Sequence, residues 1–265
     1  MSSALEKYLA AIREGRPINF EAFRKLLPAS IAGRWSRHFD VERVSQQRWR
    51  VRIVDTSVAA ELEQLARVPG TRREAALQGD SHRRETATAF VLVYHEALID
   101  PRPDVVCLNA GRCHLGFAPK ATALVVENED NFAQARQMLA FAASCLGEPL
   151  ALDCCDVVLG GGNRVLRAPV MDWLAGYDRV LCAFDYDLGG LKMFQALRER
   201  LGDRAHFLQP PDWTLYHAGF CKTPGSPQRL IEAIERAGAL GFTGLAERFR
   251  ETRQFMEQEI ILDEH

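Results

Sequence analysis

The second half of the chain alternates between short apolar runs and stretches with helical periodicity. Four apolar runs predict strands: ATALVVEN (121–128), CDVVLGGG (155–162), RVLCAFD (179–185) and AHFLQ (205–209). Nearly continuous apolar strands are typical of a parallel sheet that is buried on both faces. The periodic stretches between them predict helices over 130–145, 163–174 and 188–201, followed by two more over about 227–237 and 245–262. This alternation predicts an α/β domain with a parallel sheet and covering helices.

The first part of the chain has a different pattern. Helical periodicity predicts helices over 3–14, 19–27 and 28–39. The segment VERVSQQRWRVRIVD (41–55) then reads as a hairpin, because its second strand alternates three apolar residues with three arginines. Helices followed by a basic ribbon are the order of a winged helix, in which the ribbon lies along phosphates. An ordinary amphipathic hairpin would show the same alternation, and both interpretations stay open.

The middle of the chain connects these two patterns. A helix is expected over 58–68, and the polar, charge-dense stretch 71–85 is the best candidate for a linker. TAFVLVY (88–94) and DVVCLN (104–109) suit strands, and 111–120 is turn-like. We therefore expect three parts: a winged-helix-like DNA-binding arm (1–70), a linker with accessory strands (71–119) and the α/β catalytic domain (120–265).

Charge is unevenly distributed between these parts. The net charge is −2, yet residues 18–54 hold eight Arg or Lys and only three acidic residues. A basic module beside an acidic one is typical of a nucleic-acid-binding arm next to a carboxylate site, although a solvated charged face would look the same. The arginines expected to contact DNA are Arg34, Arg37, Arg48, Arg50 and Arg52.

Composition narrows the cellular setting. No apolar run among the 265 residues approaches the roughly 20 needed to cross a bilayer, so no membrane association is expected. The early charges in MSSALEKYLAAIREG do not suit a secretory signal. Seven scattered cysteines without a C-x-x-C pair suit a reducing compartment and no zinc site. We expect a cytoplasmic, nucleoid-associated protein.

Three carboxylates follow the predicted strands. Glu127 ends the first strand of the α/β domain, and Asp185 and Asp187 end the third. The carboxyl ends of parallel strands meet at one edge, where unpaired acids would repel one another. Mg²⁺ or Mn²⁺ would remove this repulsion, and Gly189 and Gly190 would leave room for a phosphate at the next helix. A lone D-x-D can also be helix-cap chemistry, but Glu127 on an earlier strand favours a metal site.

The segments LVVENEDNF, VVLGGGNRVLRAPVMDWL and VLCAFDYDLGGLKMF together resemble the Toprim domain of topoisomerases, primases and several nucleases. Its pattern is Glu after the first strand, a Gly-rich end to the second and D-x-D after the third, in a Rossmann-like sheet. The resemblance covers residues 121–209. It is nearest to the topoisomerase VI A subunit, its meiotic relatives and the Toprim nuclease subunit of Wadjet or Mks (MukBEF-like) SMC plasmid-defence systems, in which a winged helix precedes the Toprim domain.

The resemblance implies a choice between two chemistries. The topoisomerase branch attacks DNA with a winged-helix tyrosine, and residues 18–55 contain no tyrosine. The implied activity is therefore cleavage of DNA by metal-activated water, with two ions that lie about 3.5–4 Å apart in the usual scheme. A tyrosine transesterase and a non-catalytic DNA-binding Toprim subunit remain alternatives. A HAD-type phosphatase fits less well, because Leu188 follows the D-x-D where that family has Thr or Val.

The same resemblance extends to further residues and partners. The defence nucleases carry an E-Q-E-like segment on a late helix, which matches Glu257 and Glu259 in FMEQEII. Residues two apart do not share a helical face, so one at most should reach the metal, and Glu259 is favoured. Lys192 is a candidate phosphate contact. The implied partners are double-stranded DNA, an SMC–kleisin complex and a second copy of the chain in a homodimer.

Overall fold

The computed structural model describes residues 4–66, 73, 86–109 and 111–262. The chain divides into two compact units, Met1–Thr86 and Ala87–His265, which are described separately. The linker expected over 71–85 lies outside the described residues except for Arg73. Within the described ranges, no helix has the length and apolar character that a bilayer span requires.

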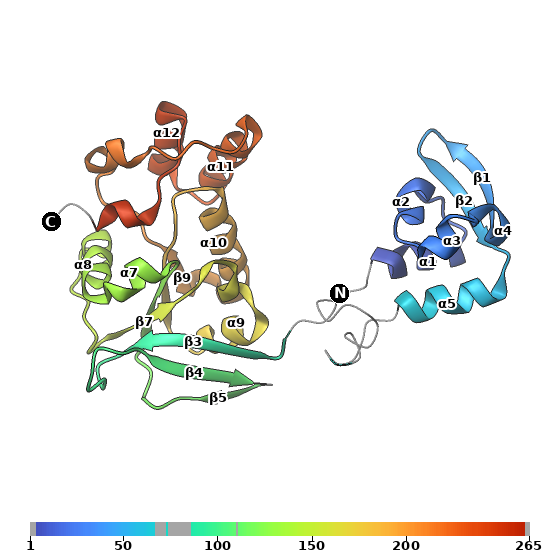
Figure 1. Ribbon diagram of the computed structural model, residues 1–265. Coiled ribbons are helices and arrows are strands. Elements are labelled where there is room, and N and C mark those ends of the chain that lie inside the picture. The colour runs from blue at the N-terminus through green and yellow to red at the C-terminus, as the bar shows by residue number, and fades with distance from the viewer. Residues whose placement is uncertain (1–3, 67–72, 74–85, 110, 263–265) are drawn as a thin grey trace. The chain divides into compact units, whose positions relative to one another are not determined.

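The first unit consists of short helices and a hairpin (Figure 1). Its elements are α1 (Ala4–Arg13), α2 (Phe20–Arg24), α3 (Ala29–Ala32), α4 (Trp35–His38), β1 (Phe39–Ser45), β2 (Arg48–Ile53) and α5 (Thr56–Ala66). The carboxamide of Asn19 caps α2 by accepting from the Ala22 N–H at 3.1 Å. The expectation of a single helix over 28–39 is wrong, because α3 ends at Ala32 with Gly33 as its C-cap, and α4 starts separately at Trp35. The expected helix over 58–68 is present as α5, and residues 67–68 lie outside the described part.

The hairpin confirms the alternation seen in the sequence. β1 and β2 pair antiparallel, with Val51 buried and Arg48, Arg50 and Arg52 exposed on the other face. Two of these arginines face acids on the neighbouring strand: Arg50 pairs with Glu42 at 3.1 Å, and Arg52 with Asp40 at 2.6 Å. The basic face is thus present but partly neutralised. The winged-helix identity of the unit stays a prediction.

In the described part of the second unit, seven strands form one sheet in the order β5-β4-β3-β7-β6-β8-β9. They are β3 (Thr88–Tyr94), β4 (Asp104–Asn109), β5 (Arg112–His114), β6 (Thr122–Val126), β7 (Cys155–Leu159), β8 (Arg179–Ala183) and β9 (Ala205–Phe207). The α/β class is confirmed, and β6 to β9 are parallel as expected. The sheet is nevertheless mixed, because β3, β4 and β5 extend it with antiparallel pairings. The segment expected to be turn-like contains β5.

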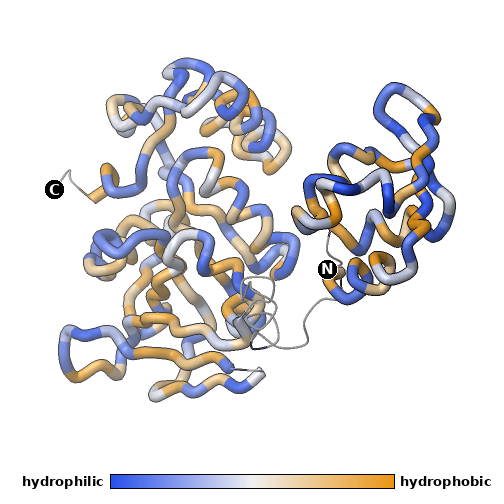
Figure 2. The backbone as a smooth tube through the Cα atoms, turned by 45° about the vertical axis from the view of Figure 1, so that its right-hand side comes forward, coloured by the Kyte–Doolittle hydropathy of each residue, from blue (hydrophilic) through white to orange (hydrophobic). Residues whose placement is uncertain are grey.

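Helices cover both faces of this sheet. α7 (Glu129–Ala133) and α8 (Ala135–Leu146) lie on one side, and α9 (Ala168–Leu174) and α10 (Leu188–Leu201) lie on the other (Figure 1). The helix expected over 130–145 is split at Gln134, and the one over 163–174 begins as the 3-10 turn η2 (Gly162–Leu166). Figure 2 shows apolar and polar stretches following one another along the chain of this unit, and all five residues of β6 are buried.

The end of the chain departs from the expected helix over 245–262. After α11 (Pro227–Ala239), α12 (Thr243–Thr252) stops because Arg253 adopts a left-handed conformation with φ 57°. The chain then runs extended through Phe255 and Met256 before the 3-10 turn η5 (Gln258–Ile261). Both extended residues are buried, Phe255 at 3% and Met256 at 0% exposure, which explains why the chain leaves the helix here: it buries an apolar pair under the site.

Candidate active site

The site forms where β6 and β8 end. The two strands pair in parallel with Val126 opposite Ala183, and the Glu127 N–H donates to the Ala183 carbonyl at 3.0 Å. The helices that follow β6 and β8 lie on opposite faces of the sheet (Figure 1). The two chain segments therefore diverge at this edge of the sheet. Ligands of open α/β sheets bind at such a switch point.

Glu127 directly follows the end of β6. Its Oε2 accepts from the main-chain N–H of Asp185 at 2.9 Å, which joins the ends of the two strands. Burial raises the pKa of Glu127 to about 7, and the negative charges of Asp185 and Asp187 add to this effect. The positive charge of Lys222 lowers the pKa of Glu127 but does not offset the loss of water, so the carboxyl group is only partly ionised at neutral pH.

Asp185 and Asp187 lie on one side of the loop after β8, and Tyr186 lies on the other. Tyr186 is fully buried, and its hydroxyl donates to the Leu208 carbonyl at 3.2 Å. Asp185 Oδ1 accepts from the Gln258 N–H at 3.0 Å. Burial raises the pKa of Asp185 to about 6, with a further contribution from the charges of Asp187 and Glu259. Asp187 caps α10, because its Oδ1 accepts from the Gly190 N–H at 2.9 Å.

The glycines around the site are needed for packing. A Cβ at Gly190 would lie 2.1 Å from the Asp185 carbonyl oxygen, so only glycine lets α10 start this close to the D-x-D loop. Gly161 and Gly162 have φ of 61° and 59°, and the Gly162 N–H donates to the Glu127 carbonyl at 3.1 Å. The triple glycine is thus a tight turn that supports the main chain of Glu127.

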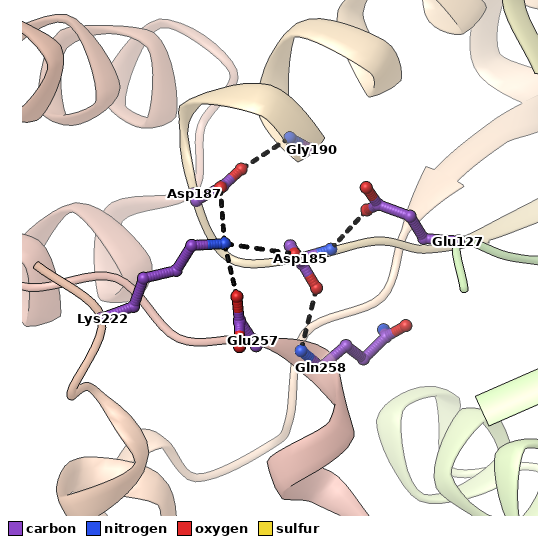
Figure 3. A network of polar contacts seen from close by, with 7 residues as sticks. All are labelled: Glu127, Asp185, Asp187, Gly190, Lys222, Glu257 and Gln258. Atoms are coloured by element: carbon purple, nitrogen blue, oxygen red, sulfur yellow. Dashed lines mark hydrogen bonds and ion pairs between the residues drawn. The ribbon is translucent and has the colours of Figure 1, made fainter. Parts of the chain in front are cut away.

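Lys222 is a member of the site that the sequence did not indicate. Figure 3 shows its ammonium between three carboxylates. The Nζ atom lies 2.7 Å from Glu257 Oε1, 3.5 Å from Asp187 Oδ2 and 3.7 Å from Asp185 Oδ2. Partial burial alone would lower the pKa of Lys222, but the hydrogen bond to Glu257 and the charges of the aspartates outweigh it and raise the pKa. A single lysine in a loop has no sequence signal that would mark it.

The E-Q-E segment reaches the site as extended chain and 3-10 turn. Gln258 was not predicted from the sequence as a residue of the site. The structure places it there with its side chain fully buried. In the amide orientation that satisfies both of its polar atoms, its side chain donates to the Ala183 carbonyl at 2.8 Å and accepts from the Phe184 N–H at 3.2 Å. The E-Q-E pattern was the signal that could have found it. Gln258 therefore fixes the end of β8 and the carboxylate of Asp185 together.

Glu257 and Glu259 flank this glutamine. Glu257 is half-exposed and binds Lys222. Glu259 is partly buried, one of its carboxylate oxygens (Oε2) has no hydrogen-bond partner, and it lies near enough to raise the pKa of Asp185. The expectation that only one of the two acids could approach the site assumed a helix, and the helix is absent here.

The remaining predicted residues lie elsewhere. Lys192 on α10 pairs with Glu232 of α11 at 2.9 Å rather than with the carboxylates. The five arginines expected to bind DNA belong to the first unit, where Arg34 and Arg37 are exposed and Arg48 donates to the Pro17 carbonyl at 3.3 Å.

The carboxylates of the site are of the chemical type that binds a divalent cation. Carboxylate oxygens are the donors that Mg²⁺ and Mn²⁺ prefer, and the raised pKa values of Glu127 and Asp185 indicate charge that no cation fully offsets. Within the described residues, however, no three His, Cys, Asp or Glu side chains are grouped as an ion would require. The ammonium of Lys222 lies beside two of the carboxylates instead.

Comparison with known proteins adds no assignment. No family model matches the chain, and no curated protein is similar to it. Function is therefore inferred from the geometry of the site and from the motifs in the sequence.

Proposed function

We propose that the protein is a metal-dependent DNA endonuclease, in which Glu127, Asp185 and Asp187 hold Mg²⁺ or Mn²⁺ and Glu259 is a further ligand. One observation carries the proposal: carboxylates from two adjacent parallel strands converge at the switch point of the sheet, linked by the bond from the Asp185 N–H to Glu127. Burying acids together is costly unless a cation binds them. An arrangement that raises the pKa values of two acids is typical of a functional site.

The chain's own residues prepare this edge for a phosphodiester. Bound divalent ions would supply an activated water and stabilise the leaving oxygen. α10 is 14 residues long and begins at the site, so the positive end of its dipole favours an anionic group there. Asp187 fixes the start of this helix, and Gln258 orients Asp185.

Hydrolysis is favoured over attack by a tyrosine. Tyr186 is the tyrosine next to the carboxylates in sequence, but it is fully buried with its hydroxyl bound to Leu208. In the first unit, Tyr8 is half-buried and packs on Phe23 with ring centroids 5.6 Å apart. The hydroxyl of Tyr186 is therefore not exposed as a nucleophile, and residues 18–55 of the first unit contain no tyrosine. A non-catalytic DNA-binding subunit is the remaining alternative, and metal-dependent cleavage distinguishes it.

DNA binding and partners complete the proposal. The first unit would act as the winged-helix-like arm, with Arg34, Arg37, Arg48, Arg50 and Arg52 along phosphates. Exposed ion pairs such as Arg52–Asp40 are worth about 0–1 kcal/mol, so these arginines can exchange an acid for a phosphate at little cost. Phosphate contacts specify no site. Selectivity for plasmid or foreign DNA would come from an SMC–kleisin (MukBEF-like) complex, and a two-fold homodimer would cut both strands.

The test is cleavage of supercoiled plasmid by the purified chain with Mn²⁺ and with EDTA. The wild type should nick or linearise the plasmid only with metal. Glu127→Gln, Asp185→Asn and Asp187→Asn should each abolish cleavage, because each removes a charged ligand at nearly constant volume. Asp172→Asn is the matched control, because Asp172 lies on α9, is exposed and pairs with Arg200 of α10. Wild-type rates in the three site variants would refute the proposal.

A further inference from the structure

We propose that Lys222 is a built-in counter-cation of the carboxylate site: it holds Asp185 and Asp187 together when no divalent ion is bound, and the ion displaces it. This inference rests on the proposed function, because it concerns how the same carboxylates receive their metal. It assigns a role to a residue that neither the motifs nor the expected ligand set includes.

The position of the ammonium supports this role. Its distances to Asp187 Oδ2 and Asp185 Oδ2 are 3.5 Å and 3.7 Å, and in Figure 3 the lysine points into the space between the two aspartates. The side chains of Asp185 and Asp187 are only 17% and 15% exposed. Water therefore screens their repulsion poorly, and a nearby positive charge is needed to offset it.

The main chain around Lys222 is firmly attached to the D-x-D loop. Lys222 and Phe255 exchange two main-chain hydrogen bonds, at 3.0 and 2.8 Å, and Met256 exchanges two more with Tyr186, at 3.0 and 3.2 Å. The buried pair Phe255–Met256 thus lies between the lysine and the tyrosine of the loop. The base of the lysine is fixed, while its ammonium is at the end of a flexible, partly exposed side chain.

Glu257 offers the ammonium a second position when an ion occupies the aspartates. A divalent ion bound to either Oδ2 would repel a second cation at contact distance from the same oxygen. Glu257 lies further out, with its side chain 51% exposed, and already binds the ammonium at 2.7 Å. Lys222 can therefore leave the aspartates without losing its nearest partner. This arrangement gives Glu257 a function distinct from that of Glu259.

The experiment measures Mn²⁺ binding to the full-length protein by isothermal titration calorimetry, without DNA. Lys222→Met removes the competing charge, so it should bind Mn²⁺ about fivefold more tightly than the wild type, the change expected when an ion-pair interaction of about 1 kcal/mol no longer has to be broken. Lys120→Met is the matched control: Lys120 pairs with Glu96 near the opposite end of β6. Its affinity for Mn²⁺ should equal that of the wild type.

The outcomes separate this inference from the proposed function. Unchanged or weaker Mn²⁺ binding in Lys222→Met, with normal binding in the wild type, would overturn the counter-cation role and leave the metal site intact. Absence of Mn²⁺ binding in the wild type would overturn the proposed function and this inference with it. Lys222→Gln carries the same test if the Met variant does not fold, because it also removes the charge and can still donate to Glu257.

Discussion

Gly190 gives the sharpest test of how the site is built. It lies in the first turn of α10, where a Cβ atom would be 2.1 Å from the carbonyl oxygen of Asp185 and 3.1 Å from its carbonyl carbon. Its φ is not in the left-handed region, so the constraint is purely steric. Gly190→Ala must therefore push α10 away from the loop that carries both aspartates.

The magnitude follows from two opposing contributions. Replacing glycine with alanine inside a helix would by itself gain about 1 kcal/mol. Overpacking in a well-packed region costs about 1–3 kcal/mol and sometimes more. The contact here is with main chain rather than with a flexible side chain, so we expect a cost beyond this range and, after the gain is subtracted, a net loss of at least about 2 kcal/mol in the free energy of unfolding. DNA cleavage should be lost as well, because the aspartates move with the loop.

Gly238→Ala provides the matched control. Gly238 is an exposed glycine within α11, and no atom lies within 4 Å of its would-be Cβ. Alanine there should stabilise the protein by about 0.4–1 kcal/mol. Urea denaturation followed by circular dichroism measures both variants, and calorimetry assigns the change to one of the two units. A Gly190→Ala variant as stable as the wild type would refute the steric argument.

The remaining predictions concern pH, DNA binding and partnership. In the metal-free protein the pKa of Glu127 is raised to about 7 from an ordinary 4.5, so the folded state binds the extra proton and stability falls as pH rises through this window. Glu127→Gln should therefore be more stable than the wild type at pH 8, by up to about 3 kcal/mol, and no more stable at pH 4. If the stability of the variant and of the wild type had the same slope against pH, this prediction would be contradicted. The arginines of the hairpin that are expected to contact phosphates are Arg48, Arg50 and Arg52. Replacing all three with alanine should reduce the slope of log Kd against log salt by about 0.9 for each lost phosphate contact. An unchanged slope would leave the hairpin without a role in DNA binding. The isolated protein should cleave closed circular plasmid slowly and its SMC complex with ATP should accelerate this; equal rates on circular and linear DNA without the complex would point to a free-standing nuclease.

The sequence determined the elements whose signal is local. Continuous apolar runs marked β6 to β9, because a parallel strand buried on both faces needs no polar positions. The position of Glu127 and of the D-x-D pair after two of these runs placed the site at one edge, since parallel strands share the direction of their carboxyl ends. The alternation of arginines in β2 fixed the exposed face of the hairpin in the same way.

Tertiary structure decided what depends on distant contacts. Antiparallel addition of β3 to β7 joins residues more than sixty positions apart, and periodicity carries no information on partners. The segment 253–257 has helical periodicity, but burial of Phe255 and Met256 against Tyr186 and Lys222 outweighs it, because tertiary packing contributes more than weak local propensity. That packing brings Lys222 and Gln258 to Asp185. Lys222 has no local pattern that distinguishes it, and the E-Q-E motif marks Gln258 without showing what it contacts, so only the folded chain shows that the carboxylates have a cation and an amide among them.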